Sequence, residues 1–167
     1  DNGDAEWSSG WSTNHKAEYY ASAKLTGSRG LRIQGDPDEL RYSAYSLNMN
    51  ESSNNTFVLS GWSKGFSIPE TTSDVNKRYY GLKLDIIYSD NTKEIHHVPF
   101  SDTVTTWQYT SGNIVPKQQD KTIKQIIVYC VYSKNANTAY FDNISLRKEP
   151  VETYKYDSKG NVVAVNQ

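Results

Sequence analysis

The chain has 167 residues, of which 36% are hydrophobic and 13% aromatic, and its formal net charge is −1. This length suffices for one domain with a sizeable core, and the near-neutral charge gives no electrostatic basis for binding nucleic acid. No apolar run approaches the ~20 residues that a membrane-spanning helix needs. We therefore expect neither a nucleic-acid partner nor insertion into a membrane.

The 13 Tyr and 4 Trp are a high aromatic load, and aromatic side chains beyond the needs of a core tend to lie at binding surfaces. The single cysteine, Cys130, cannot form an internal disulfide, so cysteine usage leaves the redox compartment undetermined. We expect it to be a small buried side chain. The sequence begins at Asp1 without a signal-peptide pattern, and we interpret it as a piece of a longer chain.

Short segments with two-residue periodicity follow one another along most of the chain. The first 16 residues are rich in Gly, Asn, Ser and Trp and are predicted to be irregular, with Trp7 and Trp11 anchoring them on the rest of the fold. Turn signals separate the later segments. The expected strands cover residues 19–25, 31–33, 41–49, 56–64, 78–89, 93–100, 107–115, 123–133 and 138–147.

The clearest alternation lies in 78–89, where every second residue is large and apolar or aromatic over five positions. Asp90-Asn91 joins this segment to 93–100 as a hairpin. Segment 123–133 is apolar on both faces, as a central strand should be, and a turn at 135–137 follows it. No segment has a sustained helical period, so the sequence predicts an all-β antiparallel sandwich of about eight or nine strands. The alternating residues are Tyr80, Leu82, Leu84, Ile86 and Tyr88.

Segment 138–147 carries the least expected residue of the chain. Its alternation places Tyr140, Ile144 and Leu146 on one face, and Asp142 interrupts that row. A carboxylate among core-facing side chains is costly unless a partner satisfies it. Two explanations are open from the spacing: Asp142 caps a nearby loop through backbone N–H groups, or it holds a hard cation such as calcium.

Three stretches, in this order, resemble the jelly-roll carbohydrate-binding modules of bacterial cell-surface and polysaccharide-degrading proteins. Trp107-Gln108 fits the Trp-Gln pair that follows a long loop in that pattern. The resemblance spans roughly residues 2–147 and implies a jelly-roll sandwich that binds sugar. The three stretches are Asn2-Gly3-Asp4-Ala5-Glu6 followed by Trp11, Phe57-Val58-Leu59-Ser60-Gly61-Trp62-Ser63-Lys64, and Tyr140-Phe141-Asp142-Asn143-Ile144-Ser145-Leu146.

The same resemblance implies a structural calcium ion. In such modules the ion joins an N-terminal acidic residue, here Glu6, to the aspartate of the last strand, here Asp142. Backbone carbonyls near Gly27 and Gly30 would complete the oxygen shell. Two carboxylates with neutral carbonyls balance a divalent charge, and the ion would tie the N-terminal segment to the closing strand.

The chain changes character at Glu149-Pro150, so we divide it into a sandwich module, 1–149, and a linker with the start of a second element, 150–167. The pattern Tyr154-x-Tyr156-Asp157-x-x-Gly160-Asn161 resembles the beginning of a YD-repeat array. Such arrays occur in secreted, Rhs-type bacterial wall-associated proteins. This resemblance implies an extracellular or cell-surface location and neighbouring domains in a larger chain. A single unit of this kind cannot bury its own apolar face.

Sugar recognition needs flat aromatic rings for pyranose faces and polar groups for hydroxyls. Trp62 is the first candidate because alternation places it opposite the core-facing Phe57 and Leu59. Simple packing is the alternative: Trp62 is covered by the loop at 65–76, and Tyr42, Lys83 and Asp85 form an ordinary solvated sheet face. The remaining candidates, expected to point outward from their own strands, are Tyr42, Lys83, Asp85 and Tyr129.

Catalysis has little support in the sequence. His96 and His97 are neighbours on one strand and point to opposite faces, so they cannot hold one metal ion from one side. No nucleophile elbow, metalloprotease spacing or phosphate-binding glycine loop is present. A glycosidase needs two carboxylates across a cleft, and nothing selects a second acid to act with Asp85.

The sequence thus predicts a non-catalytic, extracellular module that binds a polysaccharide or other glycan by aromatic stacking. Two or three stacked rings, offset by ordering costs, suggest about −4 to −7 kcal/mol, or roughly millimolar to ten-micromolar dissociation constants. The alternative is a structural or adhesion spacer of a YD-repeat protein that binds no sugar. An open groove with Trp62 beside Lys83 and Asp85 would favour sugar binding, and a buried Trp62 would favour the spacer.

Overall fold

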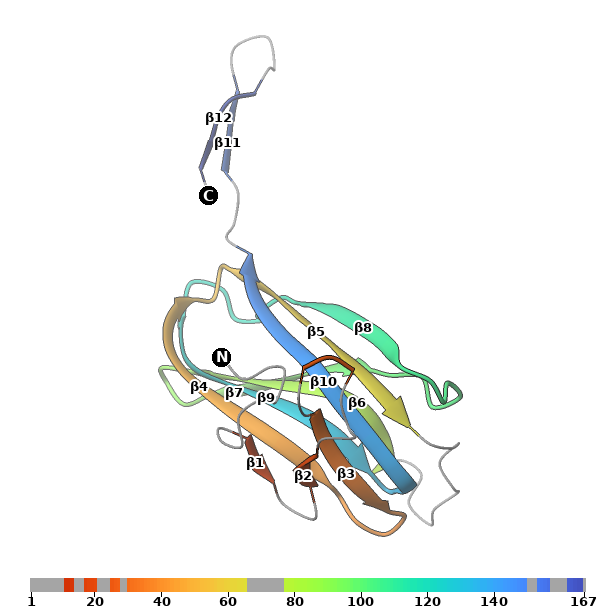
Figure 1. The fold of residues 1–167 in the computed structure, drawn as a ribbon. Coiled ribbons are helices and arrows are strands. Elements are labelled where there is room, and N and C mark those ends of the chain that lie inside the picture. The colour runs from red at the N-terminus through yellow and green to blue at the C-terminus, as the bar shows by residue number, and fades with distance from the viewer. Residues whose placement is uncertain are drawn as a thin grey trace.

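The computed structural model describes residues 11–13, 17–20, 25–27, 30–65, 77–149, 153–156 and 162–166. Two five-stranded antiparallel sheets lie face to face (Figure 1), and a separate two-stranded sheet follows them. The strands are β1 (Trp11–Thr13), β2 (Ala17–Tyr20), β3 (Gly30–Asp36), β4 (Tyr42–Ser52), β5 (Thr56–Gly65), β6 (Tyr79–Tyr88), β7 (Lys93–Pro99), β8 (Gln108–Ile114), β9 (Thr122–Ser133), β10 (Asn135–Glu149), β11 (Thr153–Tyr156) and β12 (Val162–Asn166).

Sheet A has the order β1-β4-β9-β6-β7, and sheet B has the order β2-β3-β10-β5-β8. From β3 to β6 the chain changes sheet at every step, and it does so again from β7 to β10. This is the antiparallel jelly-roll sandwich that the periodicity and the motif order predict. In the part of the chain that is described, no helix is long and apolar enough to cross a membrane.

The alternation in β6 sets the inner face of sheet A. Tyr80, Leu82, Leu84, Ile86 and Tyr88 are all buried in the core, as predicted. The predicted hairpin is confirmed: Asn91 takes a left-handed backbone (φ 68°) in the turn that joins β6 to β7. The segment predicted to be central is also confirmed, because β9 pairs with β4 on one side and β6 on the other.

Gly61 marks a close approach between the sheets. It lies on the core face of β5 with Phe57 and Leu59, which are 3% and 0% exposed. A Cβ atom at Gly61 would lie 2.5 Å from Ile144 Cδ1 of the neighbouring strand β10 and 3.3 Å from Leu82 Cδ1 of the opposite sheet. Only glycine therefore fits here without displacing core side chains.

The N-terminal anchor has partly the expected form. Trp11 is buried, as predicted, and its ring centroid lies 5.5 Å from that of Tyr45 in an edge contact. It belongs to the short strand β1, which pairs with β4, rather than to irregular chain. Trp7 lies outside the described residues.

A bulge in β10 corrects the predicted face of Asp142. The register with β5 shifts between Asp142 and Ser145, and Asn143 takes a left-handed backbone (φ 50°). The extra residue changes the alternation, so Phe141 and Ile144 both face the core. The prediction that Tyr140 shares a face with Ile144 is therefore wrong, and Asp142 points away from the core row.

The connection from β9 to β10 is shorter than the sequence predicts. We expected a turn at 135–137, but β10 already begins at Asn135 and only Lys134 separates it from β9. Lys134 takes a left-handed backbone (φ 57°) and donates its N–H to the Glu39 carbonyl at 2.8 Å. This single residue carries the chain from sheet A to sheet B.

The C-terminal strands β11 and β12 pair with each other and with neither large sheet. They lie within segment 150–167, where the start of a second element is expected. The division of the chain at residue 149 stays a prediction.

Candidate functional site

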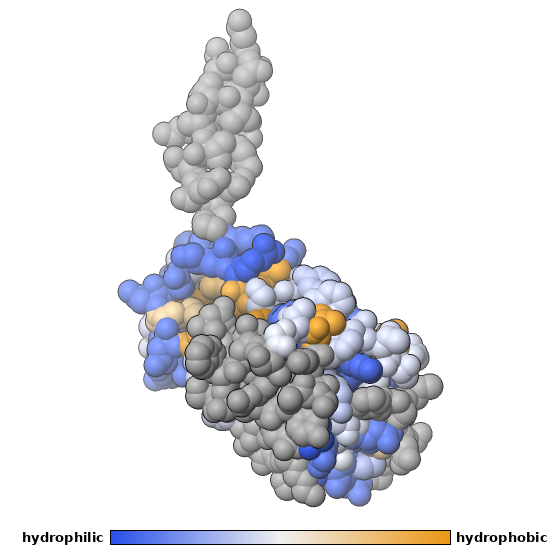
Figure 2. All heavy atoms as spheres, viewed as in Figure 1, coloured by the Kyte–Doolittle hydropathy of each residue, from blue (hydrophilic) through white to orange (hydrophobic). Residues whose placement is uncertain are grey.

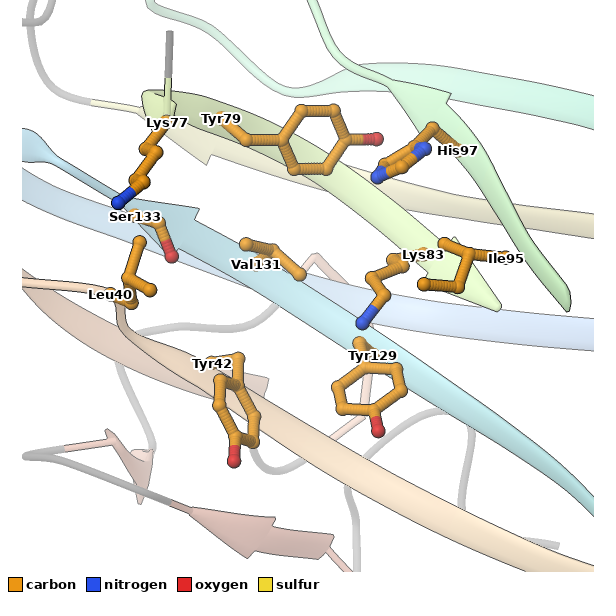
Figure 3. Close-up of a pocket in the computed structure, with 10 residues that line it drawn as sticks. All are labelled: Leu40, Tyr42, Lys77, Tyr79, Lys83, Ile95, His97, Tyr129, Val131 and Ser133. Carbon is orange, nitrogen blue, oxygen red and sulfur yellow. The ribbon is translucent and has the colours of Figure 1, made fainter. Parts of the chain in front are cut away.

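An open hollow lies on the outer face of sheet A (Figure 3). Its volume is about 400 Å³, within the ~300–1,000 Å³ of typical ligand pockets. Three of the five residues predicted to bind sugar line it, namely Tyr42, Lys83 and Tyr129. The other lining residues are Leu40, Lys77, Tyr79, Ile95, His97, Val131 and Ser133.

The antiparallel register gathers these side chains. Lys83 of β6 stands opposite Tyr129 of β9 on one side and His97 of β7 on the other. Two residues along, Val131 stands opposite Tyr42 of β4. Residues directly opposite each other on paired strands lie on the same face of the sheet. Because Lys83 points outward, Tyr129 and His97 point outward as well. In Figure 3, Val131 lies between Tyr79 and the two tyrosines Tyr42 and Tyr129.

Tyr79 is fixed along the upper side of this hollow in Figure 3. Its hydroxyl donates to the Leu82 carbonyl at 2.6 Å, and its ring contacts His97 edge-on with centroids 5.0 Å apart. Gly81 makes room for the Tyr79 ring, because a Cβ atom there would collide with the tyrosine hydroxyl. Burial raises the pKa of Tyr79 well above its usual range, so the hydroxyl remains a donor.

His97 lines the hollow, whereas His96 points into the sandwich and contacts the Glu94 carboxylate at 2.6 Å. The prediction that the two histidines face opposite sides is confirmed. Burial, together with the nearby Lys83 charge, lowers the pKa of His97. The His97 ring is therefore neutral at pH 7.

Lys83 lies at the centre of a small charge arrangement. Its Nζ is 4.2 Å from the centroid of the Tyr129 ring and 3.4 Å from Asp85 Oδ1. Lys93 Nζ lies 3.6 Å from the other Asp85 oxygen. Burial and then the Asp85 charge raise the pKa of Tyr129 to about 12, so this phenol stays neutral.

Asp85 does not reach the hollow. Its side chain is 1% exposed, and the carboxylate lies behind Lys83 and Lys93. We expected it to contact sugar hydroxyls directly, but in this geometry it positions two lysines. Tyr42 is half-buried, and its ring meets that of Tyr129 edge-on, with centroids 5.3 Å apart and planes at 73°.

Trp62 lies on the other sheet. It is half-buried on the outer face of β5 in sheet B, where its ring centroid is 5.3 Å from that of Tyr109. Tyr109 is 55% exposed, so the pair forms a second, separate aromatic surface. The expectation that Trp62, Lys83 and Asp85 share one surface is wrong. The described surface seen in Figure 2 is largely hydrophilic, with apolar side chains in small groups.

Asp142 caps a loop. Its Oδ2 accepts hydrogen bonds from the N–H groups of Leu25 (2.8 Å) and Thr26 (3.0 Å), and its Oδ1 accepts from Asn143 N–H (2.9 Å). The side chain of Asn143 accepts from the Thr26 hydroxyl at 3.0 Å. The loop-cap explanation of Asp142 is therefore confirmed, and the carboxylate is fully buried.

The donor set at Asp142 bears on the predicted calcium ion. A carboxylate offers about four lone pairs, and three N–H groups already use three of them. Among the described residues, no group of three or more His, Cys, Asp or Glu is placed to hold a metal ion. The second predicted ligand, Glu6, lies outside the described residues.

Sequence reasoning missed more than half of the hollow. Tyr79 and His97 could have been predicted from the sequence. Tyr79 lies four residues before Lys83 on the same predicted strand and so shares its face, and His97 lies opposite Lys83 on the strand predicted to form a hairpin with it. Leu40 and Lys77 carried none, since they lie just outside β4 and β6. Residues just before or after a strand reach a site only if the connecting segment follows a suitable path, and alternation within strands does not predict that path.

No protein-family model matches the sequence, and no curated protein matches it. Solved structures share its fold. The CBM22-1 xylan-binding domain of Paenibacillus barcinonensis Xyn10C is 14% identical over 83% of this chain and 85% of that chain, with a TM-score of 0.58. TmCBM61 in complex with β-1,4-galactotriose is 16% identical over 89% and 96%, with a TM-score of 0.50.

A third match belongs to a larger protein. The CBM22-1–GH10 modules of Clostridium thermocellum xylanase 10B, solved with xylohexaose, are 9% identical over 83% of this chain, with a TM-score of 0.61. The match covers 26% of that chain. At these identities the likeness concerns the fold: this chain is a β-sandwich of the kind that carbohydrate-binding modules use.

Proposed function

We propose that this protein is a non-catalytic carbohydrate-binding module that binds a glycan chain across the outer face of sheet A. The observation that carries the proposal is the open hollow lined by Tyr42, Tyr79 and Tyr129. The fold supports it, because two of the matched structures hold an oligosaccharide and a third is described as xylan-binding.

The geometry gives each side chain a distinct part. Tyr42 offers a ring against which a pyranose stacks, and aromatic rings supply such area at low entropic cost. The hydroxyls of Tyr42 and Tyr129 exchange hydrogen bonds with sugar hydroxyls. Tyr79, fixed by its own hydrogen bond to Leu82, keeps the upper side of the hollow in place without reordering on binding.

A glycan array tests both the function and its location. We expect wild-type protein to bind at least one glycan, and Tyr42→Ala to weaken that binding about tenfold, the effect of one stacked ring worth ~1.4 kcal/mol. Trp62→Ala is the matched control, because it removes an aromatic ring from the outer face of the opposite sheet.

The two variants separate the possible outcomes. Loss of signal in Trp62→Ala with an intact signal in Tyr42→Ala would move the site to the Trp62–Tyr109 surface. Wild-type protein that binds no glycan on a broad array would favour the spacer function instead. Circular dichroism of both variants confirms that each is folded.

We also propose that a structural calcium ion joins Asp142 to Glu6. Support comes from the position of Asp142, which already ties residues 25–26 to the closing strand, and from its carboxylate, an oxygen ligand of the kind that calcium prefers. Thermal melts with added calcium and with EDTA test this proposal. We expect EDTA to lower the midpoint, and equal midpoints in the two solutions would contradict the ion.

The location and context of the module follow from the same proposal. A domain that binds polysaccharide acts where polysaccharide is, so we place it outside the cell or at the cell surface. The YD-repeat pattern at 154–161 favours a larger wall-associated chain in which neighbouring domains are its covalent partners.

A further inference from the structure

We propose that the hollow on sheet A selects an acidic glycan, a chain whose sugars carry carboxylate groups, over a neutral one. This inference rests on the proposed function, because it names the class of glycan that the same surface binds. Charge, geometry and the cost of burying an ammonium group all lead to it.

Among the described residues, the lysines that line the hollow carry its only formal charges. The described lining includes Lys77 and Lys83 but no Asp or Glu, although the whole chain has a net charge of −1. His97 adds no charge at pH 7. A surface that concentrates positive charge on a slightly acidic protein favours an anionic ligand.

The one nearby carboxylate does not cancel this charge. Asp85 is 1% exposed and is shared between Lys83 and Lys93, so one anion faces two cations. Neither Asp85 oxygen accepts a hydrogen bond from another described residue. A carboxylate arriving from solvent on the far side of Lys83 would therefore meet an excess of positive charge while Asp85 stays covered.

Lys83 occupies the position where a neutral sugar would stack. Its Nζ lies 4.2 Å from the centroid of the Tyr129 ring, so an ammonium group covers this ring face. The ring and Asp85 hold Lys83 from two directions, which reduces the ordering cost when it binds a ligand. A neutral sugar that displaced water here would remove hydration from the ammonium group without adding an anion to Asp85, which Lys83 already shares with Lys93, and this is costly.

The lining favours carboxylate over phosphate. It contains no arginine, the side chain whose planar fork binds phosphate oxygens in pairs. Single ammonium groups match the single charge of a carboxylate. The tyrosine rings beside them, Tyr42 above all, supply the stacking contact for the sugar that bears it.

Isothermal titration with two oligosaccharides of equal length tests this inference. The probes are an oligogalacturonate and the corresponding neutral oligogalactan. We expect wild-type protein to bind the oligogalacturonate more tightly, and Lys83→Gln to weaken that binding about tenfold or more, since a charge-assisted hydrogen bond is lost. Raising the salt concentration should weaken binding of the acidic probe only.

Two further variants make the result specific. Lys83→Arg keeps the charge and should retain the preference for the acidic probe. Lys148→Gln removes an exposed lysine from sheet B, where it pairs with Glu51 at 3.0 Å, and should change neither affinity. Near-ultraviolet circular dichroism checks that all three variants keep the wild-type packing.

Equal affinity for the two probes, or an equal loss of both in Lys83→Gln, would overturn the selection of acidic glycans. In that case, neutral binding that Tyr42→Ala abolishes would leave the proposed function intact. Absence of binding to either probe and to a broad array would instead remove both.

Discussion

Replacing Glu94 with alanine should lower the free energy of unfolding by about 3–4 kcal/mol, because it leaves several buried donors without an acceptor. Glu94 lies on the inner face of β7 and is 8% exposed. Its carboxylate accepts a hydrogen bond from the Tyr88 hydroxyl. The Lys117 N–H lies 3.0 and 3.1 Å from the two carboxylate oxygens, and His96 Nε2 lies 2.6 Å from one of them. Urea unfolding at pH 7 measures the loss.

Glu51→Ala provides the matched control for Glu94→Ala. Glu51 pairs with Lys148 at 3.0 Å across the protein surface, and both side chains are at least one-third exposed. Exposed pairs of this kind contribute up to about 1 kcal/mol. Similar losses in the two variants would show that the Glu94 cluster has no special weight in the fold.

The same cluster predicts a dependence on pH. Burial alone would raise the pKa of Glu94, but hydrogen bonds from Tyr88, His96 and Lys117 N–H outweigh burial and lower the pKa from its usual 4.5. Because the folded-state pKa is lowered, the ionised carboxylate stabilises the fold fully above pH 4.5. This contribution to the free energy of unfolding is lost as the pH falls below 4.5. The stability difference between wild type and Glu94→Gln should therefore shrink from pH 4.5 downward.

Replacing Asp142 with asparagine should cost about 2–3 kcal/mol, because three N–H groups lose a charged acceptor. Hydrogen exchange gives a local readout: the amides of Leu25 and Thr26 should exchange faster in the variant. Asp102→Asn is the control, since its pair with Arg78 is partly exposed and contributes little.

EDTA separates the cap from the proposed ion. The loss in Asp142→Asn should persist in EDTA, because the N–H contacts need no metal. A stability difference that vanishes entirely in EDTA would mean that Asp142 acts only through a cation. Unchanged exchange at Leu25 and Thr26 would contradict the cap.

Alternation along single strands was enough to predict the sandwich. The five inward residues of β6 and the opposite directions of His96 and His97 follow from two-residue periodicity alone. Periodicity assigns a side chain to a face of its own strand, but it does not say which sheet the strand joins. For this reason the outward directions of Trp62 and Lys83 are predicted correctly, but the prediction that both lie on the same sheet is wrong.

Features that depend on distant partners could not be predicted. The bulge at Asn143 is defined by the register with β5, and it reverses the face that Asp142 and Tyr140 were expected to occupy. Glu94 occupies a core-facing position because the N–H of Lys117, 23 residues later in the chain, satisfies it. Neither the bulge nor the contact between Glu94 and Lys117 can be predicted from the sequence of a single strand.

The left-handed residue in β10 also constrains how this protein can change its length. The bulge at Asn143 shifts the inward–outward alternation of β10 by one residue. Because of this shift, the part of the strand before Asn143 and the part after it both present apolar side chains to the core. Deleting one residue there would invert one half, turning Ile144 and Leu146 toward solvent and Ser145 and Arg147 inward. Homologous sequences should therefore gain or lose residues in the connections between strands and keep the spacing across this point fixed.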